Sequence, residues 1–300
     1  MEFLLGGVAA MGATFFTNPL EVIKTRMQLQ GELSARKQYV VQYKNFVHGG
    51  YTIAKHDGIL ALQAGLVPGL WFQLCLNGFR LGAYDIIDSI GWLRNAEGKL
   101  VFYKTVIASA VTGMGGSIIG SPFYLVKTHI QAQSAKEIAF GHQHNHEGMI
   151  KAFRNIYNEH GIKGLFRGSL SSIPRAVIGS ASQLTSFEYA KQWIRKNGYF
   201  EGSIVLQLFA ASMIGGINVT LMMTPFDLIA TRLYNQGVDS HGRGLLYSGY
   251  VDCIIKIWKS EGFLGFYKGI GPQYVRLGPH TVLCLMFWDE LRIFYSKFNS

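Results

Sequence analysis

Charged side chains are scarce in this sequence of 300 residues. Asp, Glu, Lys and Arg make up 15% of it and hydrophobic residues 49%, whereas ordinary soluble domains carry roughly a quarter charged residues. No such charge interrupts four long stretches, residues 3–20, 59–79, 105–126 and 202–226. Each approaches or exceeds the roughly 20 residues that a helix needs to cross a bilayer. Two shorter stretches, 176–187 and 277–287, are extended by flanks that hold one arginine each. The pattern predicts six membrane spans; a soluble helical bundle is the alternative.

Cysteine is also rare, and its three copies exclude several kinds of site. Cys75, Cys253 and Cys284 lie in or near apolar segments, without the spacing of a disulfide framework or a zinc site. The sequence also lacks a nucleophile elbow, a phosphate-binding glycine loop and a zinc-binding HExxH pattern. These absences argue against an enzyme.

Acidic residues are outnumbered by basic ones, 18 to 28, which gives a formal net charge of +10. Such an excess is typical of chains that meet nucleic acid, a membrane surface or anionic ligands. The basic residues form no dense run and accompany no nucleic-acid-binding motif, so nucleic acid is not expected as a partner. Many lie in the polar connections, where such residues commonly set membrane orientation. No secretory peptide or arginine-rich presequence precedes the first stretch, so import into an organelle would need an internal signal.

Three copies of one pattern run through the chain. The first motif occupies residues 18–26, 121–129 and 224–232, and its prolines, Pro19, Pro122 and Pro225, are evenly spaced. A glycine-containing motif follows at residues 57–65, 160–168 and 261–269. An acid-bearing motif comes third, at residues 84–85, 187–191 and 288–292. The shared order and register predict three repeats, 1–99, 100–200 and 201–300, within one membrane domain covering residues 1–300.

Each repeat is expected to fold as a helix, a polar loop with a short amphipathic helix, and a second helix. The short helices are expected near residues 46–57, 149–160 and 250–261, each ending at a glycine. A pair of membrane helices cannot satisfy its polar groups alone, so three pairs should close around a shared axis. The predicted fold class is therefore an all-α membrane protein with six transmembrane helices in three pseudosymmetric repeats.

The pattern proline, any residue, acid, any two residues, base, repeated three times, resembles the mitochondrial carrier family over essentially the whole chain. Membership implies a monomeric, three-fold pseudosymmetric bundle in the mitochondrial inner membrane, with a central site that opens alternately to either side. It also implies import by internal signals and, in place of a cofactor, bound cardiolipin. The lipid headgroups are expected near Gly65, Gly168 and Gly269, because helix amino termini suit phosphate groups. Residues 175–177 and 276–281 look like the dicarboxylate and keto-acid branch, and residues 76–84 most resemble the oxaloacetate-carrier-like subgroup.

The resemblance implies a gate at the matrix side. The acid and base of each proline motif lie three residues apart, on one helix face, and each acid is expected to meet the base of another repeat. The expected pairs are Glu21 with Lys127 and Asp227 with Lys24.

The third pair of this gate is absent, because Tyr124 and Ala230 replace its acid and its base. The double loss is coherent, since either charge alone would be buried and unpaired. Gln28 and Gln131, four residues after the lysines, are expected to brace the two remaining ion pairs by hydrogen bonds.

A second gate is implied at the cytoplasmic side. Its expected members are Asp85, Glu188, Lys191, Asp289 and Arg292. Asp88 occupies the position of the third base, so about two ion pairs are expected here as well.

Arginine supplies every formal charge between the two gates. The second, fourth and sixth spans contribute Arg80, Arg175 and Arg276, with no acid in the same stretches. A charge at membrane depth is costly and usually marks a ligand path, and guanidinium groups bind carboxylate or sulfate through paired hydrogen bonds. These arginines predict an anionic cargo; lipid snorkelling is the alternative for each of them.

Arg175 and Arg276 precede the gate acids of their helices by the same number of residues, which predicts a matched depth. The same offset in the first repeat falls on Phe72, beside Gln73. One aromatic and polar side and two charged sides favour a small anion with two acidic groups, or with one acidic group and a keto oxygen. Oxaloacetate, malate, malonate, sulfate and thiosulfate fit this description.

Four further residues have open roles. Asn77 and Gln183 are candidate substrate contacts, with helix packing as the alternative. Arg80 lies one turn from Asp85 and serves either the substrate or the gate. His280 is interpreted as a packing residue, with proton coupling as the alternative.

Two rival interpretations concern function. A regulated proton leak, as in uncoupling proteins, uses the same scaffold and is the alternative to anion exchange. Residues 142–147, His-Gln-His-Asn-His-Glu, form the one tempting metal cluster, but their place in a polar connection favours a solvated loop, and no metal is expected.

Overall fold

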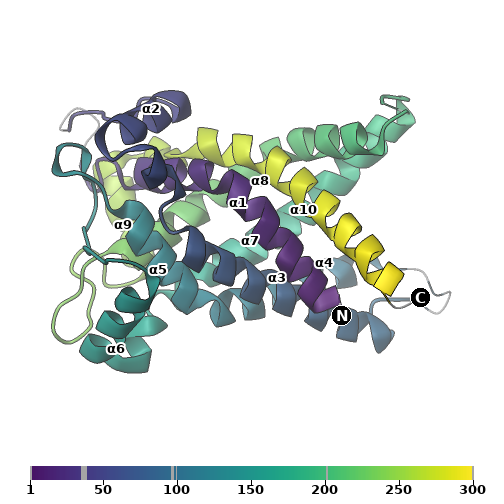
Figure 1. Cartoon of the computed structure of the whole chain (residues 1–300), viewed down its shortest axis with the longest axis horizontal. Helices are drawn as coiled ribbons and strands as arrows, with labels where there is room; N and C mark the ends of the chain where they lie inside the picture. The colour runs from purple at the N-terminus through teal and green to yellow at the C-terminus, as the bar shows by residue number, and fades with distance from the viewer. Residues whose placement is uncertain (1, 35–38, 96–97, 99, 201, 299–300) are drawn as a thin grey trace.

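The computed structural model describes residues 2–34, 39–95, 98, 100–200 and 202–298, and the long elements of this part of the chain are helices joined by turns and loops (Figure 1). The α-helices are α1 (Glu2–Leu29), α2 (Phe46–His56), α3 (Leu66–Ser89), α4 (Phe102–Ile119), α5 (Ser121–Ala132), α6 (Met149–Leu165), α7 (Ser169–Lys196), α8 (Ile204–Asn235), α9 (Tyr250–Glu261) and α10 (Ile270–Phe298). Three 3₁₀ turns join them: η1 (Ile59–Gln63), η2 (Lys136–Ile138) and η3 (Phe263–Tyr267). The predicted all-α class is confirmed.

The same unit occurs three times, as a long helix, a short helix and a second long helix. The short helices α2, α6 and α9 lie where the sequence predicted them. Each reaches a glycine with positive φ, at Gly58 (85°), Gly161 (63°) and Gly262 (70°). In α6 the helical backbone resumes after Gly161, so the assigned helix continues across a kink to Leu165.

The three proline motifs differ in their effect on the helix. α1 and α8 continue through Pro19 and Pro225. In the second unit the helix breaks at Gly120, and α4 and α5 meet at 66°. Glycine is a poor helix former, so its place just ahead of the Ser-Pro pair accounts for a break in this unit alone.

Six long helical segments are present in the described residues: α1, α3, the bent pair α4–α5, α7, α8 and α10. By length and composition, Ile59–Ser89 and Leu206–Asn235 are long and apolar enough to cross a membrane, and the bent pair passes the same test when α4 and α5 are taken together. The other segments are more polar than a simple span. α7, for example, holds Arg175, Glu188 and Lys191 as well as several serines, which suits a helix with one face on an aqueous cavity.

The six segments form a closed ring. α1 packs on α3, α3 on α4, α4 on α7, α7 on α8, α8 on α10, and α10 on α1 again. At one end, which also carries α2, α6 and α9, the proline-containing helices α1, α5 and α8 contact one another. We call this the loop end; it is the matrix side in the family that the sequence resembles.

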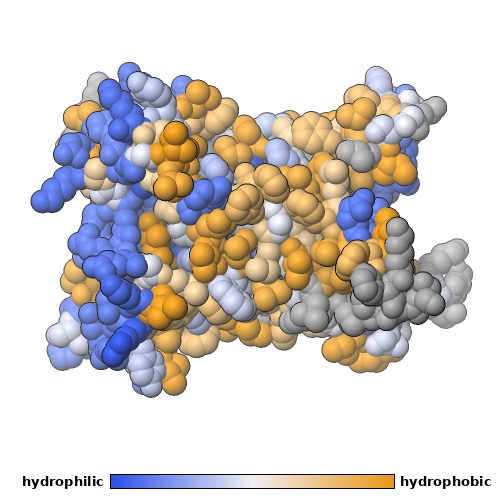
Figure 2. Space-filling model, in the orientation of Figure 1, coloured by the Kyte–Doolittle hydropathy of each residue, from blue (hydrophilic) through white to orange (hydrophobic). Residues whose placement is uncertain are grey.

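The surface matches this arrangement. Figure 2 shows hydrophobic side chains over the middle of one face, whereas hydrophilic side chains gather at the loop end. A belt of apolar side chains around a ring of helices is the surface that a bilayer covers.

Candidate functional site

A cavity of about 350 Å³ lies inside the ring and is lined by residues of all three units. All seven residues predicted to contact substrate line it: Phe72, Gln73, Asn77, Arg80, Arg175, Gln183 and Arg276. At the loop end it reaches Glu21, Lys24, Lys127 and Asp227, the four charged members of the expected matrix gate. The structure therefore brings the two predicted sets together in one space.

Both expected ion pairs of the matrix gate are present. Lys24 Nζ lies 2.9 Å from Asp227 Oδ2, and the Lys127 ammonium contacts the Glu21 carboxylate. All four side chains are buried. Because each pair joins two different units, the pairs hold α1 to α5 and to α8 and close the cavity at this end.

The two glutamines behave differently. Gln28 Nε2 donates to Asp227 Oδ2 at 2.9 Å, so it braces its ion pair as predicted. The prediction for Gln131 is wrong in this state of the molecule. Its oxygen accepts from Thr25 and its nitrogen donates to Asn18, both on α1. Gln131 therefore strengthens the contact between α5 and α1 without touching Glu21 or Lys127 directly.

An apolar contact fills the position of the missing third pair. Tyr124 and Ala230 belong to one buried cluster with Phe72 and Tyr234. The rings of Tyr124 and Tyr234 meet edge to face, 4.9 Å apart, and the Tyr234 hydroxyl bonds the Ser121 hydroxyl at 2.8 Å. Apolar packing therefore closes the gate at the position of the third ion pair, where no charged group has to be desolvated.

Two of the predicted substrate arginines have acidic neighbours, which corrects the expectation that they are unopposed. Arg276 Nη1 lies 3.0 Å from Glu21 Oε1, and Arg175 Nη1 lies 3.9 Å from Asp227 Oδ1. The expectation rested on the absence of acidic residues from the span that holds each arginine. Here the carboxylates come from α1 and α8, so Glu21 and Asp227 each face a gate lysine and a cavity arginine.

The cavity nevertheless keeps an excess of positive charge. Its lining holds five cationic side chains, Lys24, Arg80, Lys127, Arg175 and Arg276, and two carboxylates, Glu21 and Asp227. Among the residues that the structure describes, the buried Nε atoms of Arg175 and Arg276 have no hydrogen-bond partner. An unpaired buried donor is costly, and an incoming anion would satisfy it.

An aromatic pair positions Arg175. Its guanidinium lies 4.8 Å from the ring centroid of Tyr124 and 5.9 Å from that of Phe72. Such contacts favour a cation. The two rings hold the guanidinium over the floor of the cavity. Phe72 therefore positions Arg175, which is a role other than direct substrate binding.

Arg80 lies further from the gate. It forms no ion pair with any residue that the structure describes, and it lines both the central cavity and a neighbouring one of about 340 Å³. The gate role that one turn of helix suggested with Asp85 is therefore not seen. Asn77 Nδ2 donates to Gln73 Oε1 at 2.9 Å, which orients both amides at the cavity wall.

Gln273 is a cavity residue that the sequence reasoning missed. It is buried, and its Oε1 has no partner. It precedes Arg276 by one helical turn, and that spacing would have placed both on one face. His280, one turn further along, has Nδ1 3.1 Å from the Thr17 hydroxyl, a contact that fits the packing interpretation.

The opposite end of the cavity is open. Asp85, Glu188, Lys191, Asp289 and Arg292 form no ion pair with one another; Lys191 and Arg292 instead lie over Phe187 and Trp288 on their own helices. Asp88 pairs with Arg94, 2.9 Å away, outside the ring. The two cytoplasmic pairs predicted from the sequence are absent while the matrix gate is closed, so their gating role stays a prediction.

Three glycines make equivalent contacts between units. Gly65, Gly168 and Gly269 have φ of 67°, 81° and 81°, and each stands just before the second long helix of its unit. A Cβ there would meet Gln131, Tyr234 or Gln28 respectively, which are the equivalent residues of the neighbouring units. The glycines let these units approach closely. Cardiolipin binding near them stays a prediction.

Gly269→Ala is expected to destabilise the protein. At a φ of 81° an alanine costs about 1–2 kcal/mol in backbone energy alone. Its Cβ would also lie 3.0 Å from Gln28 Cγ. Thermal unfolding of the purified protein checks this, with Gly202→Ala as control because Gly202 has open space around it. Equal midpoints for the two variants would refute the packing role.

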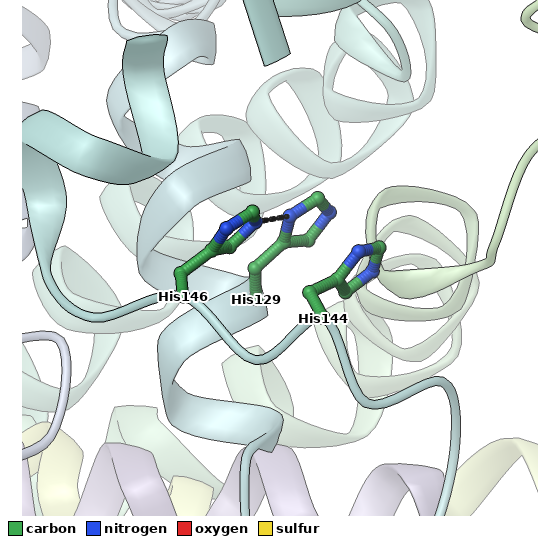
Figure 3. A group of neighbouring side chains, drawn as sticks. All are labelled: His129, His144 and His146. Carbon is green, nitrogen blue, oxygen red and sulfur yellow. Dashed lines mark hydrogen bonds between the residues drawn. The ribbon is translucent and has the colours of Figure 1, made fainter. Parts of the chain in front are cut away.

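The histidine-rich connection is not the solvated loop that the sequence suggested. His144 and His146 are half-buried and lie beside His129 of α5, as Figure 3 shows. One ring nitrogen from each histidine lies within 4.8 Å of the other two. His142 is exposed, and its ring meets that of His144 at 4.5 Å.

Comparisons with known proteins show the family of the chain. The family profile described as "Mitochondrial carrier protein" matches residues 1–92, 98–198 and 202–299. The chain is 49% identical to solute carrier family 25 member 35 of Mus musculus over 298 residues, covering 99% of both chains. It is 40% identical to a mitochondrial oxaloacetate transport protein of Schizosaccharomyces pombe, covering 99% of this chain and 92% of the relative. It is 36% identical to mitochondrial citrate transporter E of Aspergillus niger, covering 96% and 91%. The chain therefore belongs to the mitochondrial carrier family, and it is a multi-pass transporter of the mitochondrial inner membrane, not an enzyme.

Proposed function

We propose that this carrier transports small organic dianions, of which oxaloacetate and short dicarboxylates are the first candidates, and that it exchanges them by alternating access. The observation that carries the proposal is the charge of the cavity, with five cations against two carboxylates. A dianion entering this space meets Arg175 and Arg276 at its floor and Arg80 on its wall. Paired hydrogen bonds from guanidinium to carboxylate supply both affinity and orientation.

The relatives support the same class of cargo. One is named for oxaloacetate and another for citrate, both carboxylates with more than one acidic group. A cavity of about 350 Å³ is at the small end of ligand pockets, which run from about 300 to 1,000 Å³. That size favours a short dicarboxylate over a nucleotide. The inorganic dianions sulfate and thiosulfate are further candidates, because they offer the same charge in a compact form.

The shared carboxylates suggest how cargo would open the gate. Glu21 faces both Lys127 and Arg276, and Asp227 faces both Lys24 and Arg175. Cargo that binds Arg276 and Arg175 draws these side chains away from the carboxylates of Glu21 and Asp227. It also places its own negative charge beside the gate. A ligand shifts a conformational equilibrium only through such a difference in its contacts between two states.

A substrate screen tests the proposal. Purified carrier is reconstituted in liposomes loaded with one anion, and uptake of a second, labelled anion is followed. Oxaloacetate, malate, malonate, sulfate, thiosulfate, phosphoenolpyruvate and ADP form the panel. We expect uptake of at least one small dianion, dependent on an internal dianion, and none of ADP.

The same liposomes address the proton-leak alternative. A pH-sensitive dye inside them reports proton entry driven by a membrane potential. Exchange predicts anion uptake without a sustained proton current. Proton conductance in the absence of any anion uptake would instead favour an uncoupling carrier and refute the proposal.

A further inference from the structure

The second unit departs from the other two at one interface of the loop end. In the first unit Arg26 of α1 forms an ion pair with Asp57, and in the third unit Arg232 of α8 pairs with Glu261. Both pairs fix the end of a long helix to the short helix of its own unit. The equivalent residues of the second unit are both histidines, His129 and His160. The ion pair is therefore lost, and His144 and His146 of the following loop lie against His129 instead.

Backbone carbonyls fix the orientation of two of these rings. His129 Nε2 lies 2.9 Å from Tyr234 O, and His144 Nε2 lies 2.9 Å from Asn235 O. A carbonyl only accepts, so each Nε2 carries the proton and each Nδ1 presents a lone pair. Metal-binding histidines almost always make such a contact with their second nitrogen.

The third ring completes the arrangement. His146 Nε2 lies 3.2 Å from His129 Nδ1, and His146 Nδ1 is buried without a partner. Nitrogens bound to one zinc ion at about 2.0–2.1 Å in a tetrahedral site stand about 3.3 Å apart. His129 and His146 already have this spacing. The remaining ligand nitrogen, on His144, lies within 4.8 Å of the other two. The His144 ring is stacked on that of His129, with centroids 3.4 Å apart, so it must turn as well as approach for its lone pair to reach the same ion.

Few charged groups lie near the two loop rings. Burial lowers the pKa of His144 to about 3, and burial also lowers the pKa of His146. Glu159 and Arg167, one charge of each sign, are the charged groups whose fields reach these two loop rings.

We propose that His129, His144 and His146 bind one divalent transition metal, with zinc the best fit, and that the metal replaces in the second unit the ion pair that anchors the other two. Three imidazoles and an open fourth position are a common ligand set for zinc. Imidazole ligands also suit copper and nickel, whereas magnesium and calcium prefer oxygen. The metal would tie the loop between α5 and α6 to the end of α5 and, through Tyr234 and Asn235, to α8. It would act on the matrix side, away from the cargo cavity.

Metal titration of the full-length carrier tests this proposal. Protein purified in detergent and treated with a chelator is titrated with Zn²⁺, and bound metal is counted after equilibrium dialysis. We expect one Zn²⁺ per chain in the parent protein and a higher unfolding temperature with Zn²⁺ than with Mg²⁺. His144→Ala and His146→Ala should each lower the affinity by more than about tenfold. Co²⁺ should give a visible absorption band in the parent protein that these variants lose.

His241→Ala is the matched control, because His241 is an exposed loop histidine of the third unit. It should bind one Zn²⁺ like the parent. A second design, His129→Arg with His160→Glu, restores the arginine–acid combination of the other units. This double variant should remain as stable as the metal-free parent while losing the response to Zn²⁺. Absence of stoichiometric Zn²⁺ binding by the parent, or binding unchanged in all of these variants, would overturn the proposal.

Discussion

Arg175→Ala is expected to reduce dianion uptake in liposomes by roughly 30-fold or more, because truncating one partner of a buried charge pair costs about 2–5 kcal/mol. Arg175 lies at the cavity floor, held over Tyr124 and with its Nε unsatisfied. Asp227 is 3.9 Å away and already bonded to Lys24. The guanidinium is therefore available to cargo in a way that the gate lysines are not. Initial uptake rates of protein matched for reconstitution give the answer.

Two controls separate charge from geometry in this experiment. Arg175→Lys keeps the charge but loses the planar fork, so uptake should fall between that of the parent and that of Arg175→Ala. Lys151→Gln removes an exposed charge that pairs with Glu147 on the surface, and it should transport like the parent. Parental uptake by Arg175→Ala would show that the arginine does not bind cargo.

Lys24→Met is expected to lower the free energy of unfolding by about 3 kcal/mol, the low end of the usual result of leaving one buried partner unpaired, because Arg175 remains 3.9 Å from the Asp227 carboxylate. Asp227 is 1% exposed and would lose the ammonium 2.9 Å away. Gln28 could not neutralise the carboxylate, although it would still donate to it. The double variant Lys24→Met with Asp227→Leu should recover part of the loss, since an apolar pair of similar volume replaces a buried ion pair at little cost, while Arg175 loses its acidic neighbour.

The chain itself contains the precedent for that double replacement. Tyr124 and Ala230 occupy the third gate position and pack in an apolar cluster. The thermal unfolding midpoints of the single and double variants test whether the ion pair behaves as a unit. Lys256→Met is the control, because its pair with Asp252 is exposed and such pairs contribute about 0–1 kcal/mol. A double variant less stable than Lys24→Met would contradict the account of the gate.

The architecture could be predicted from the sequence because it is repeated three times. A single uncharged stretch with a proline is ambiguous, whereas three in register specify a helix, a short helix and a helix. The predicted boundaries of α2 and α9 differ from the observed ones by a residue at most. The break at Gly120 was not foreseen, because the proline motif alone does not distinguish a helix that continues from one that bends by 66°.

The sequence could predict only those features of the site that follow from residue positions along a single helix. Equivalent positions along the helices correctly placed Arg175, Arg276 and Phe72 in one cavity. The joint replacement of a gate acid by Tyr124 and of a gate base by Ala230 indicated that these two residues lie together. Contacts between helices of different units were harder to foresee. The approach of Arg276 to Glu21 and the hydrogen bond of Gln131 to Asn18 depend on side-chain directions at an interface. No spacing along a single helix encodes them.

The histidine cluster is a second example of a contact between distant segments that the local sequence does not predict. Residues 142–146 have the composition of a polar loop, and nothing in their local sequence reveals a partner. His129 lies in another motif, at a position where the other units have arginine. Comparing the three units position by position would have flagged His129 and His160 together. Only the fold shows that the loop turns back onto α5 (Figure 3).

The central claim is that the cationic cavity selects a cargo with two negative charges. The most direct measurement compares each dianion with the monoanion that lacks one of its carboxylates, in one batch of liposomes: oxaloacetate beside pyruvate, and malate beside lactate. Loss of one carboxylate removes one arginine contact, so the transported dianion should enter roughly 30-fold faster or more than its partner. Equal entry of both members of each pair would contradict the claim.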